Sequence, residues 1–575
     1  MLSDKLIVRN LVEICAAKGI EQVVIAPGSR NAPLIISFNE HEQFECLSIP
    51  DERVAGYFAL GIAQQTRTPV IITCTSGTAS LNFAPAIAEA FYQKIPLLII
   101  TADRPVEWIH QGEGQSINQR AVFTNYVLKS YQLPQEPEHP DELWSANRIV
   151  SEAIETCYTK GGGPVHLNIP FREPLYGQKE YSNKPLPKVI QMEKPFPIIS
   201  KERWHNLKMD WKNADKKLLI CGLLPKQEVE QELLDVIGEL VNKSDIQILS
   251  ETTSNIVLPS LFISHIDGVL SIITEAELDS FTPDLLITIG GSFVSKKLKH
   301  FIRKLSIAKH WHIGEEGDFL DTFQSVTRYI ALPVSKFFAT FIKQLPKKNK
   351  SKVAFQYKLN WLEKNAIVAE FHEKYLSKIA WCDLKAFQII LDNLPLGINL
   401  HMGNSTPVRY VQLFLSNPTI QYNSNRGVAG IDGCTSTAAG AAWVNDQLTV
   451  LITGDISFFY DSNAFWHQHL SPNLRVIIIN NGGGNIFRYI PGPPTTNQLE
   501  TYFETKQNLN AEHIAKTFNI VYYFADEEKA LKEVLSRFFK TQMNQRPAIL
   551  EIETDAEVSA TVFRDYYKSL RASSN

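Results

Sequence analysis

Short apolar runs alternate with helical stretches along this chain, in the order that builds parallel sheets. The run VLIT at residues 450–453 ends in a Gly-Asp pair, and the run VIII at 476–479 ends in Asn-Asn-Gly-Gly. Short β-branched runs bounded by polar or Gly residues are typical of buried parallel strands, which right-handed crossover helices connect. We therefore predict that Asp455 and Asn481 follow neighbouring strands and share the sheet edge where α/β proteins bind ligands.

The same pattern occurs near the start of the chain. Apolar runs lie at 70–73 and 97–100, and the tripeptide VAG recurs at 54–56 and 428–430. The offsets between the two copies, 380 residues for the first strands and 374 for VAG, nearly agree. Each VAG is predicted to begin a helix of small residues, so two similarly built α/β domains are expected to flank a third.

Two segments mark the domain boundaries. Residues 181–199 contain four prolines and have no helical period, and residues 346–352 are polar and basic. We predict three doubly wound α/β domains, each a parallel sheet flanked by helices, at residues 1–180, 200–345 and 353–575. The middle domain has no G-x-G-x-x-G after a strand, which argues against a dinucleotide site there.

The composition is that of an ordinary globular protein, and it narrows the functional classes. Of 575 residues, 44% are hydrophobic and 21% charged, and the net charge of −4 gives no sign of nucleic-acid binding. Seven cysteines stand singly without a C-x-x-C pair, which favours reduced thiols over disulfides or a zinc site. The N-terminus reads as an amphipathic helix, and no apolar run approaches the ~20 residues that span a bilayer. We expect a cytoplasmic protein without stable membrane insertion.

The residues at the ends of the two late strands suit a hard cation. The carboxylate of Asp455, the amide oxygen of Asn481 and a backbone carbonyl near Gly483 are oxygen ligands of the kind that Mg²⁺ prefers, with water and phosphates completing its shell. The alternative is an ordinary strand-end turn, in which Asp and Gly are common. The Asn-Asn-Gly-Gly sequence directly follows the next strand, just as Gly-Asp follows the first, and this agreement favours the metal site.

This arrangement resembles the diphosphate and metal motif of thiamine-diphosphate enzymes. The resemblance implies three α/β domains of that enzyme type, thiamine diphosphate as cofactor, and Mg²⁺ or Mn²⁺ held by Asp455, Asn481 and Gly483. The residues implied to contact the cofactor are Gly454, Asp455, Ile456, Ser457, Asn481, Gly483 and Ile486.

The first domain carries the other half of such a cofactor site. Glu52 opens a helix directly after Asp51, and without the resemblance the pair reads as a helix cap and a partner of the helix dipole. In the family, a Glu at this place hydrogen-bonds N1′ of the aminopyrimidine ring and thereby helps to deprotonate C2 of the thiazolium. That Glu and the metal site come from different subunits, which implies a homodimer with active sites at the interface; dimer or tetramer stays open.

Four segments narrow the resemblance to one group of these enzymes. They are APGSRNAPL at 26–34, the region 75–105 that ends in TADRP, SNRGVAGIDGCTST at 424–437 and NNGGGNIFRYIP at 480–491. Together they resemble the 2-succinyl-5-enolpyruvyl-6-hydroxy-3-cyclohexene-1-carboxylate synthases of menaquinone biosynthesis, which also lack the Gly that other relatives carry where Ile456 stands here. The resemblance implies decarboxylation of 2-oxoglutarate and a Stetter-like 1,4-addition of the succinyl carbanion to isochorismate.

The motifs also imply residues for catalysis and substrate binding. Both substrates are dicarboxylates, which Arg recognises with its bidentate fork. The residues implied to act with Glu52 in catalysis are Ser29, Gln115 and Ser405. The carboxylate-binding residues are Arg30, Arg104, Lys296, Arg409 and Arg426, each of which reads by itself as a solvated surface cation. Ile431 is expected to hold the cofactor in its bent form, and the apolar side of the pocket is expected to be lined by Ile486, Phe487 and Ile490.

Three positions leave alternatives open. Lys297 is adjacent to Lys296, and either lysine fits the pocket position. Gly114 precedes Gln115 where some relatives carry Asn, so one polar contact is expected to be absent. Arg488 follows the Ile-Phe pair, where it either contacts a carboxylate or faces solvent.

Three other functions are less consistent with the sequence. The first is another thiamine-diphosphate 2-oxo acid decarboxylase or ligase, such as an acetolactate-type synthase, against which the Arg-rich motifs argue. The second is a catalytically silent scaffold on the same fold, against which the presence of Glu52, Asp455 and Asn481 argues. The third is a nicotinamide dehydrogenase, which lacks its Gly-rich fingerprint here.

Overall fold

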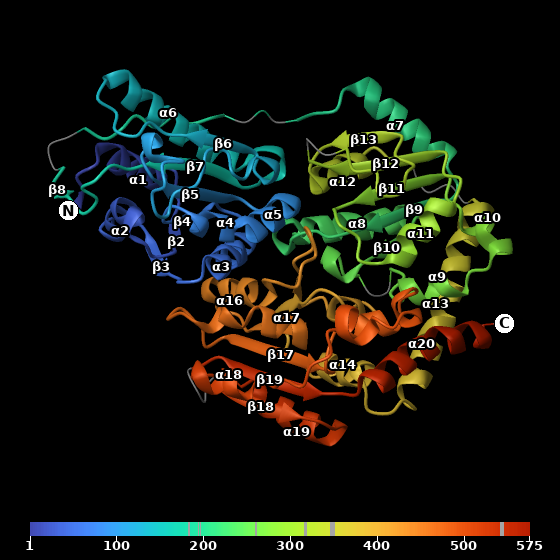
Figure 1. The fold of residues 1–575 in the computed structure, drawn as a ribbon. Helices are drawn as coiled ribbons and strands as arrows, with labels where there is room; N and C mark the ends of the chain where they lie inside the picture. The colour runs from blue at the N-terminus through green and yellow to red at the C-terminus, as the bar shows by residue number, and fades with distance from the viewer. Residues whose placement is uncertain are drawn as a thin grey trace. The chain divides into compact units, whose positions relative to one another are not determined.

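Three parallel sheets with flanking helices form the folded chain (Figure 1). The computed structural model describes residues 1–181, 185–193, 195, 197–258, 261–315, 319–345, 351–540 and 546–574. The predicted fold class, three α/β domains with parallel sheets, is confirmed.

The chain forms two compact units. The first unit comprises Met1–Lys194, Asn425–Thr449 and Ser457–Leu474. The second unit comprises Pro195–Ser424, Val450–Ile456 and Arg475–Asn575. The three predicted domain ranges stay predictions, and residues 182–184, 194 and 196 of the linker and 346–350 of the hinge lie outside the described residues.

The N-terminal sheet has the strand order β3-β2-β4-β5-β7-β6, and its pairs are parallel. Its central strands are buried on both faces, which explains their continuous apolar sequence. The strands are β2 Gln22–Ile25, β3 Glu45–Ser48, β4 Val70–Cys74, β5 Leu97–Asp103, β6 Lys129–Gln132 and β7 Val165–Pro170. The helices are α1 Leu6–Ala17, α2 Ala32–Asn39, α3 Glu52–Thr66, α4 Thr78–Asn82, α5 Ala84–Gln93 and α6 Pro140–Thr156. A short antiparallel pair, β1 Leu2–Ser3 with β8 Gln178–Lys179, joins the two ends of this domain.

The C-terminal sheet repeats this order as β15-β14-β16-β17-β19-β18. In both sheets the first strand is second in space, followed by the third, fourth, sixth and fifth, so the prediction of two similarly built domains is confirmed. The strands are β14 Asn399–Met402, β15 Gln421–Asn423, β16 Thr449–Gly454, β17 Leu474–Asn480, β18 Val521–Ala525 and β19 Ala548–Glu553. The helices are α13 Lys352–Leu376, α14 Asp383–Asp392, α15 Pro407–Val411, α16 Cys434–Val444, α17 Asp455–Tyr460, α18 Glu512–Thr517, α19 Glu528–Phe538 and α20 Ala556–Ser573.

The central sheet has the order β10-β9-β11-β12-β13 and a core rich in aromatic rings. Trp204 and Phe337 stack with their ring centroids 5.5 Å apart, and Trp211 meets Phe341 edge to face at 5.1 Å. The strands are β9 Lys217–Cys221, β10 Gln247–Ser250, β11 Leu285–Ile289, β12 Lys309–Gly314 and β13 Arg328–Ala331. The helices are α7 Lys201–Asn213, α8 Gln231–Lys243, α9 Ile266–Ile272, α10 Leu278–Phe281, α11 Lys296–Lys304 and α12 Val334–Ile342. Among the described residues, none of the helices is both long and apolar enough to cross a membrane.

The two helices of small residues, α3 and α16, pack against each other within the first unit. A Cβ added at Gly61 would lie 2.0 Å from the carbonyl oxygen of Thr437, and one at Gly440 would lie 2.0 Å from that of Phe58. Both contacts are far below van der Waals distance, so the close approach of the two backbones requires glycine at these positions.

One predicted helix begins later than its sequence pattern indicates. The helix expected from Val428 begins only at Cys434. The backbone N–H groups of Gly427 and Val428 instead donate to the buried carboxylate of Glu89, at 2.6 and 2.8 Å. Ala429 has a φ of 61°, which is incompatible with a right-handed helix. The prediction is wrong here because a side chain distant in sequence takes the N–H groups that would have begun the helix.

Candidate active site

Asp455 stands at the carboxyl edge of the C-terminal sheet, in the second unit. Strand β16 ends at Gly454, and helix α17 begins at Asp455. The carboxylate accepts from the backbone N–H of Ile456 at 2.7 Å and from Nε2 of Gln507 at 2.8 Å. The residue is 2% exposed, and burial raises its pKa to about 7. A carboxylate that burial makes costly to ionise is one that a bound cation would stabilise.

Asn481 follows β17, the strand next to β16, and a buried carboxylate orients its amide. Its Nδ2 donates to Asp383 at 2.8 Å, and Asp383 also accepts from the hydroxyl of Thr554 at 2.6 Å. Burial raises the pKa of Asp383. No described residue donates to Oδ1 of Asn481, although the side chain is buried. A buried amide oxygen without a donor is a suitable ligand for a hard cation.

The glycine turn after Asn481 has its shape fixed by Glu504. The N–H of Gly484 donates to the backbone oxygen of Glu504 at 2.6 Å. Gly483 has a φ of 154°, and a Cβ there would lie 2.8 Å from the same oxygen. Its own carbonyl accepts from the N–H of Asn485 at 2.9 Å. Glycine is therefore required at position 483 both for its φ and for the close approach of the backbone.

Arg488 is buried among glutamates of its own chain. Its Nε and Nη2 each lie 2.6 Å from an oxygen of Glu504, Nη2 lies 3.2 Å from Glu500, and Nη1 pairs with Glu557. Arg488 is 8% exposed and Glu504 is 1% exposed. Arg488 therefore neither faces solvent nor has a free fork for a substrate carboxylate. Its bonds hold in place the segment that carries three half-buried residues expected to line the pocket: Ile486, Phe487 and Ile490.

Ser405 and Arg409 are brought together in the second unit. Nη1 of Arg409 donates to the backbone oxygen of Ser405, which has a φ of 71°. Burial lowers the pKa of Arg409, and the nearby Tyr489 and Asp267 partly oppose that shift. A half-buried guanidinium in this state is suited to binding a carboxylate.

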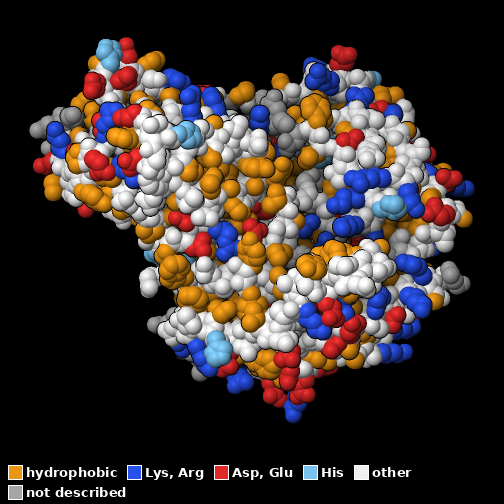
Figure 2. Space-filling view, viewed as in Figure 1, with side chains coloured by type: hydrophobic (Ala, Val, Ile, Leu, Met, Phe, Trp, Pro, Cys, Tyr) orange, Lys and Arg blue, Asp and Glu red, His pale blue; other side chains and the backbone are white. Residues whose placement is uncertain are grey.

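The structure separates the two candidate lysines of α11. Lys296, the first residue of α11, is exposed. Lys and Arg side chains gather on the surface over α11 (Figure 2). Lys297 is half-buried, donates to the hydroxyl of Ser271 at 2.8 Å and has Nζ 2.9 Å from the ring centroid of Tyr567. Burial lowers the pKa of Lys297 to about 7. Of the two, Lys296 has the side chain that is accessible to a ligand.

Glu52 lies in the first unit and is the first residue of α3. The capping function belongs to Asp51, whose Oδ1 accepts from the N–H groups of Arg53 and Val54 at 2.9 and 3.2 Å. Glu52 is half-buried, and the amide of Asn82 is 3.5 Å from its carboxylate. Burial raises the pKa of Glu52. The side chain is thus not engaged as the helix cap, and its carboxyl group holds a proton more readily than an exposed one.

Arg30 and Arg104 lie close enough to repel each other at the carboxyl edge of the N-terminal sheet. Burial and the charge of Arg104 lower the pKa of Arg30. Arg30 donates to the backbone oxygen of Phe171 at 2.9 Å and pairs with Glu173 at 3.0 Å. Arg104 donates to the backbone oxygen of Gly114 at 2.9 Å. The structure therefore brings these two predicted site residues together.

Ser29 and Gln115 are exposed, and a residue that the sequence did not single out positions the loop of Gln115. Gln119 is fully buried, accepts from the N–H of Gly77 at 2.8 Å and donates to the backbone oxygen of Ala102 at 3.1 Å. It joins this loop to the ends of two strands. Its only sequence signal is its place four residues after Gln115.

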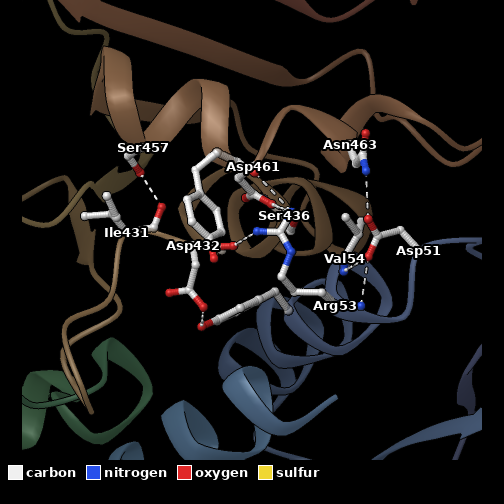
Figure 3. A network of polar contacts seen from close by, with 12 residues as sticks. Asp51, Arg53, Val54, Ile431, Asp432, Ser436, Ser457, Asp461 and Asn463 are labelled. Carbon is white, nitrogen blue, oxygen red and sulfur yellow. Dashed lines mark hydrogen bonds and ion pairs between the residues drawn. The ribbon is translucent and has the colours of Figure 1, made fainter. Parts of the chain in front are cut away.

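Ile431 belongs to the segment between the buried Arg426 and α16, and Figure 3 shows how this segment is held. The hydroxyl of Ser457 donates to the backbone oxygen of Ile431 at 2.8 Å. The next residue, Asp432, accepts from Arg53 through its backbone oxygen and from the hydroxyl of Tyr57 through Oδ2, the latter at 3.0 Å. The backbone around Ile431 is therefore fixed while its side chain stays half-buried.

Within the described residues, no group of three or more His, Cys, Asp or Glu side chains is arranged to hold a metal. Asp455 and Asn481 offer one carboxylate and one amide oxygen. This sparse protein set fits Mg²⁺ when phosphate oxygens and water complete its shell.

Two parts of the chain match known domain families. Residues 7–122 match the N-terminal TPP-binding domain of thiamine pyrophosphate enzymes, and residues 402–552 match the C-terminal TPP-binding domain of these enzymes. Glu52 falls within the first range, and Asp455 and Asn481 fall within the second. Thiamine pyrophosphate (TPP) is another name for thiamine diphosphate. These matches therefore support thiamine diphosphate as the cofactor.

Full-length relatives are similar over nearly the whole chain. A 2-succinyl-5-enolpyruvyl-6-hydroxy-3-cyclohexene-1-carboxylate synthase of Flavobacterium psychrophilum is 41% identical, with 98% of each chain covered. Proteins with the same name from Flavobacterium johnsoniae and Porphyromonas gingivalis are each 39% identical, with 98% of this chain covered and 98% and 97% of theirs.

Proposed function

Because the chain belongs to the family of thiamine-diphosphate-dependent 2-succinyl-5-enolpyruvyl-6-hydroxy-3-cyclohexene-1-carboxylate synthases, we propose that it decarboxylates 2-oxoglutarate and adds the succinyl unit to isochorismate. The addition is of the Stetter-like 1,4 type and releases CO₂ from the 2-oxo acid. Bound thiamine diphosphate would supply the nucleophilic carbon and the electron sink for decarboxylation.

The metal site is the part of this proposal that the geometry supports most directly. Asp455, Oδ1 of Asn481 and the carbonyl of Gly483 would hold Mg²⁺ or Mn²⁺ beside the cofactor diphosphate. The supporting observation is that no described residue donates to Oδ1 of Asn481. Asp383 accepts from Nδ2 of the same amide and thereby directs Oδ1 away from Asp383. The nearby Gly454, Ile456, Ser457 and Ile486 are proposed to contact the cofactor.

Glu52 is proposed to hold a proton at the aminopyrimidine ring. Its carboxyl group is half-buried and its raised pKa favours sharing a proton with a ring nitrogen. Ile431 is proposed to support the bent form of the cofactor from a backbone segment that Ser457 and Arg53 hold in place.

The cations are proposed to divide between the two dicarboxylates. Arg409, with Ser405, would bind 2-oxoglutarate, whereas Arg30 and Arg104, with Ser29 and Gln115, would bind isochorismate. Lys296 and Arg426 would add positive charge. Ile486, Phe487 and Ile490 would exclude water from the apolar side of the pocket.

We also propose a cytoplasmic homodimer with active sites at the subunit interface. The first unit exposes the apolar side chains of Leu81, which is next to the Asn82 that contacts Glu52, and of Tyr92, at 44% and 57%. All seven cysteines are free thiols, as expected in a reducing compartment. Light scattering of the purified protein would distinguish a dimer from a tetramer or a monomer.

The reaction is tested by incubating the protein with thiamine diphosphate, Mg²⁺, 2-oxoglutarate and isochorismate. Mass spectrometry should show the product named for the family, and omission of any one component should abolish it. A panel that replaces 2-oxoglutarate by pyruvate separates this function from that of an acetolactate-type synthase. Turnover of pyruvate alone, without use of isochorismate, would contradict the proposal.

A further inference from the structure

Arg53, the residue next to Glu52, is bonded to two separate segments of the first unit (Figure 3). Its guanidinium donates to the backbone oxygen of Asp432 and, at 3.2 Å, to that of Tyr460. It also lies 3.6 Å from Oδ1 of Asp461 and 5.0 Å from the ring centroid of Tyr460. Its side chain is 16% exposed, so these bonds are largely shielded from water.

The carboxylate opposite Arg53 is itself rigidly held. Asp461 is fully buried and accepts from both the backbone N–H and the hydroxyl of Ser436, at 2.7 Å each. Ser436 lies in the first turn of α16, so Asp461 is anchored to that helix. A guanidinium placed against an immobile carboxylate has little freedom to shift.

Asp51 fixes the other side of Glu52 in a similar way. Besides capping α3, it accepts from the amide of Asn463 through Oδ2 at 2.8 Å. Asn463 follows Asp461 by two residues. Glu52 therefore stands between Asp51 and Arg53, both bonded to the segment 460–463, while Arg53 also holds the backbone beside Ile431.

We propose that Arg53, supported by Asp461, is a positioning residue that sets the orientation of Glu52 and of the Ile431 segment. The inference rests on the proposed function of Glu52 as the group that shares a proton with the cofactor. Arginine is needed because its planar fork reaches two carbonyls and one carboxylate at once, whereas a lysine ammonium cannot span them.

The proposal is tested with Arg53→Met, Glu52→Gln and the double variant. Exchange of C2–H of bound thiamine diphosphate, followed by NMR, should slow about 10²–10⁴-fold in Glu52→Gln. It should slow about a hundred-fold in Arg53→Met, as a misplaced group of this kind costs. The double variant should exchange no more slowly than Glu52→Gln, because Arg53 acts through Glu52. Multiplied effects in the double variant would overturn the proposal.

A second readout uses the protein without cofactor. Amide hydrogen exchange at residues 52–57 and 430–434 should become faster in Arg53→Met, with the remaining protection unchanged. Arg148→Met, which removes an arginine paired with Glu152 on the exposed face of α6, is the matched control and should change neither readout. Unchanged protection in both segments of Arg53→Met would also overturn the proposal.

Two further variants keep the test decisive. If Arg53→Met does not fold, Arg53→Lys and Asp461→Asn replace it, and each should slow C2–H exchange at an unchanged melting temperature. Wild-type exchange in both would overturn the proposal. If instead Glu52→Gln itself leaves exchange unchanged, the proposed function of Glu52 fails, and with it this inference; slowed exchange in Glu52→Gln alone would reject only the inference.

Discussion

The N-terminal and C-terminal sheets have the same strand order but opposite charges at their carboxyl edges. The first edge carries Arg30 and Arg104, where burial and mutual repulsion lower the pKa of Arg30. The second carries Asp455, whose pKa burial raises to about 7. Burial makes each of these charges costly, so we expect a ligand of opposite charge to stabilise each edge. On this proposal, one scaffold supports two binding chemistries through a few residues at strand ends.

At the carboxyl edge of the central sheet, the chain itself supplies hydrogen-bond partners for a buried carboxylate. Glu251 follows β10 and is 1% exposed. Its two oxygens accept from the backbone N–H groups of Val294 and Ser295, at 2.7 and 2.8 Å, directly before α11. The chain itself supplies the donors that a ligand supplies elsewhere. At the edge of the C-terminal sheet, by contrast, no described residue donates to Oδ1 of Asn481. We therefore expect a ligand site where a buried polar atom at a strand end lacks a hydrogen-bond partner.

The strongest test of the anionic edge is Asp455→Ala. The variant loses the only carboxylate among the proposed metal ligands, so metal-dependent binding of thiamine diphosphate should be abolished. Calorimetric titration with the cofactor and Mg²⁺ measures the loss, and circular dichroism checks that the fold is retained. Normal cofactor affinity in a folded Asp455→Ala would contradict the assignment of this edge as the metal site.

The cationic groups are separated by comparing Arg409→Ala with Arg104→Ala. Removing one partner of a buried charged pair typically costs ~2–5 kcal/mol, or roughly thirty- to several-thousand-fold. Arg409→Ala should lose this factor in decarboxylation of 2-oxoglutarate. Arg104→Ala should decarboxylate nearly normally and lose it in the transfer to isochorismate.

Stopped-flow absorbance, recorded first without and then with isochorismate, distinguishes the two steps. If Arg104→Ala fails before CO₂ is released, or Arg409→Ala fails only afterwards, the division of the cations between substrates is wrong. The named reaction would still stand in that case.

A smaller effect is expected from Asp383→Asn, which tests how the anionic edge is oriented. An ionised Asp383 only accepts hydrogen bonds, so it draws Nδ2 of Asn481 and leaves Oδ1 for the metal. Asparagine accepts or donates, and the amide of Asn481 is then free to turn over. Mg²⁺ affinity should fall about 10–100-fold, as changes behind a metal ligand typically cause. The matched control is Asp392→Asn, at the exposed end of the same helix, which should bind Mg²⁺ normally.

The sequence predicted these edges because strand ends carry a local signal. The apolar run before Asp455 and the polar residues after each strand are contiguous, and the structure places Asp455 directly after β16. Asp383 had no such signal, since it lies 98 residues from Asn481. Gln507 is likewise 52 residues from the carboxylate that it contacts. Residues that position a ligand through distant contacts are recognised only when the fold has brought them together.

The same reason explains the two positions where local patterns misled or stayed silent. Val428 looked helical because its neighbours are small, yet Glu89 takes its N–H group. Arg488 gave no indication of its partners, because Glu504 and Glu557 reach it from other segments. Charge type is visible in a sequence, whereas charge pairing depends on tertiary structure.

The smallest expected effect concerns Glu251 at the edge of the central sheet. The variant Glu251→Gln tests how the stability of the protein depends on pH. Burial raises the pKa of Glu251 from 4.5 to about 7. Between these values the folded state keeps a proton that the unfolded chain releases, so the stability contributed by this group is present at low pH and is lost as pH rises through about 7. Glutamine does not titrate. The free energy of unfolding of the wild type minus that of Glu251→Gln should therefore fall by roughly 1–2 kcal/mol from pH 5.5 to 7.0.

Urea denaturation, followed by the fluorescence of the tryptophans in the central core, measures this difference at each pH. Glu239→Gln removes an exposed carboxylate of the same domain and serves as the matched control, with no such pH-dependent difference expected. A difference for Glu251→Gln that does not change with pH would mean that Glu251 keeps its charge throughout. The carboxyl edge of the central sheet would then carry a buried charge, as the edges of the N-terminal and C-terminal sheets do. The presence of hydrogen-bond donors from the chain would no longer distinguish a structural edge from a ligand-binding one.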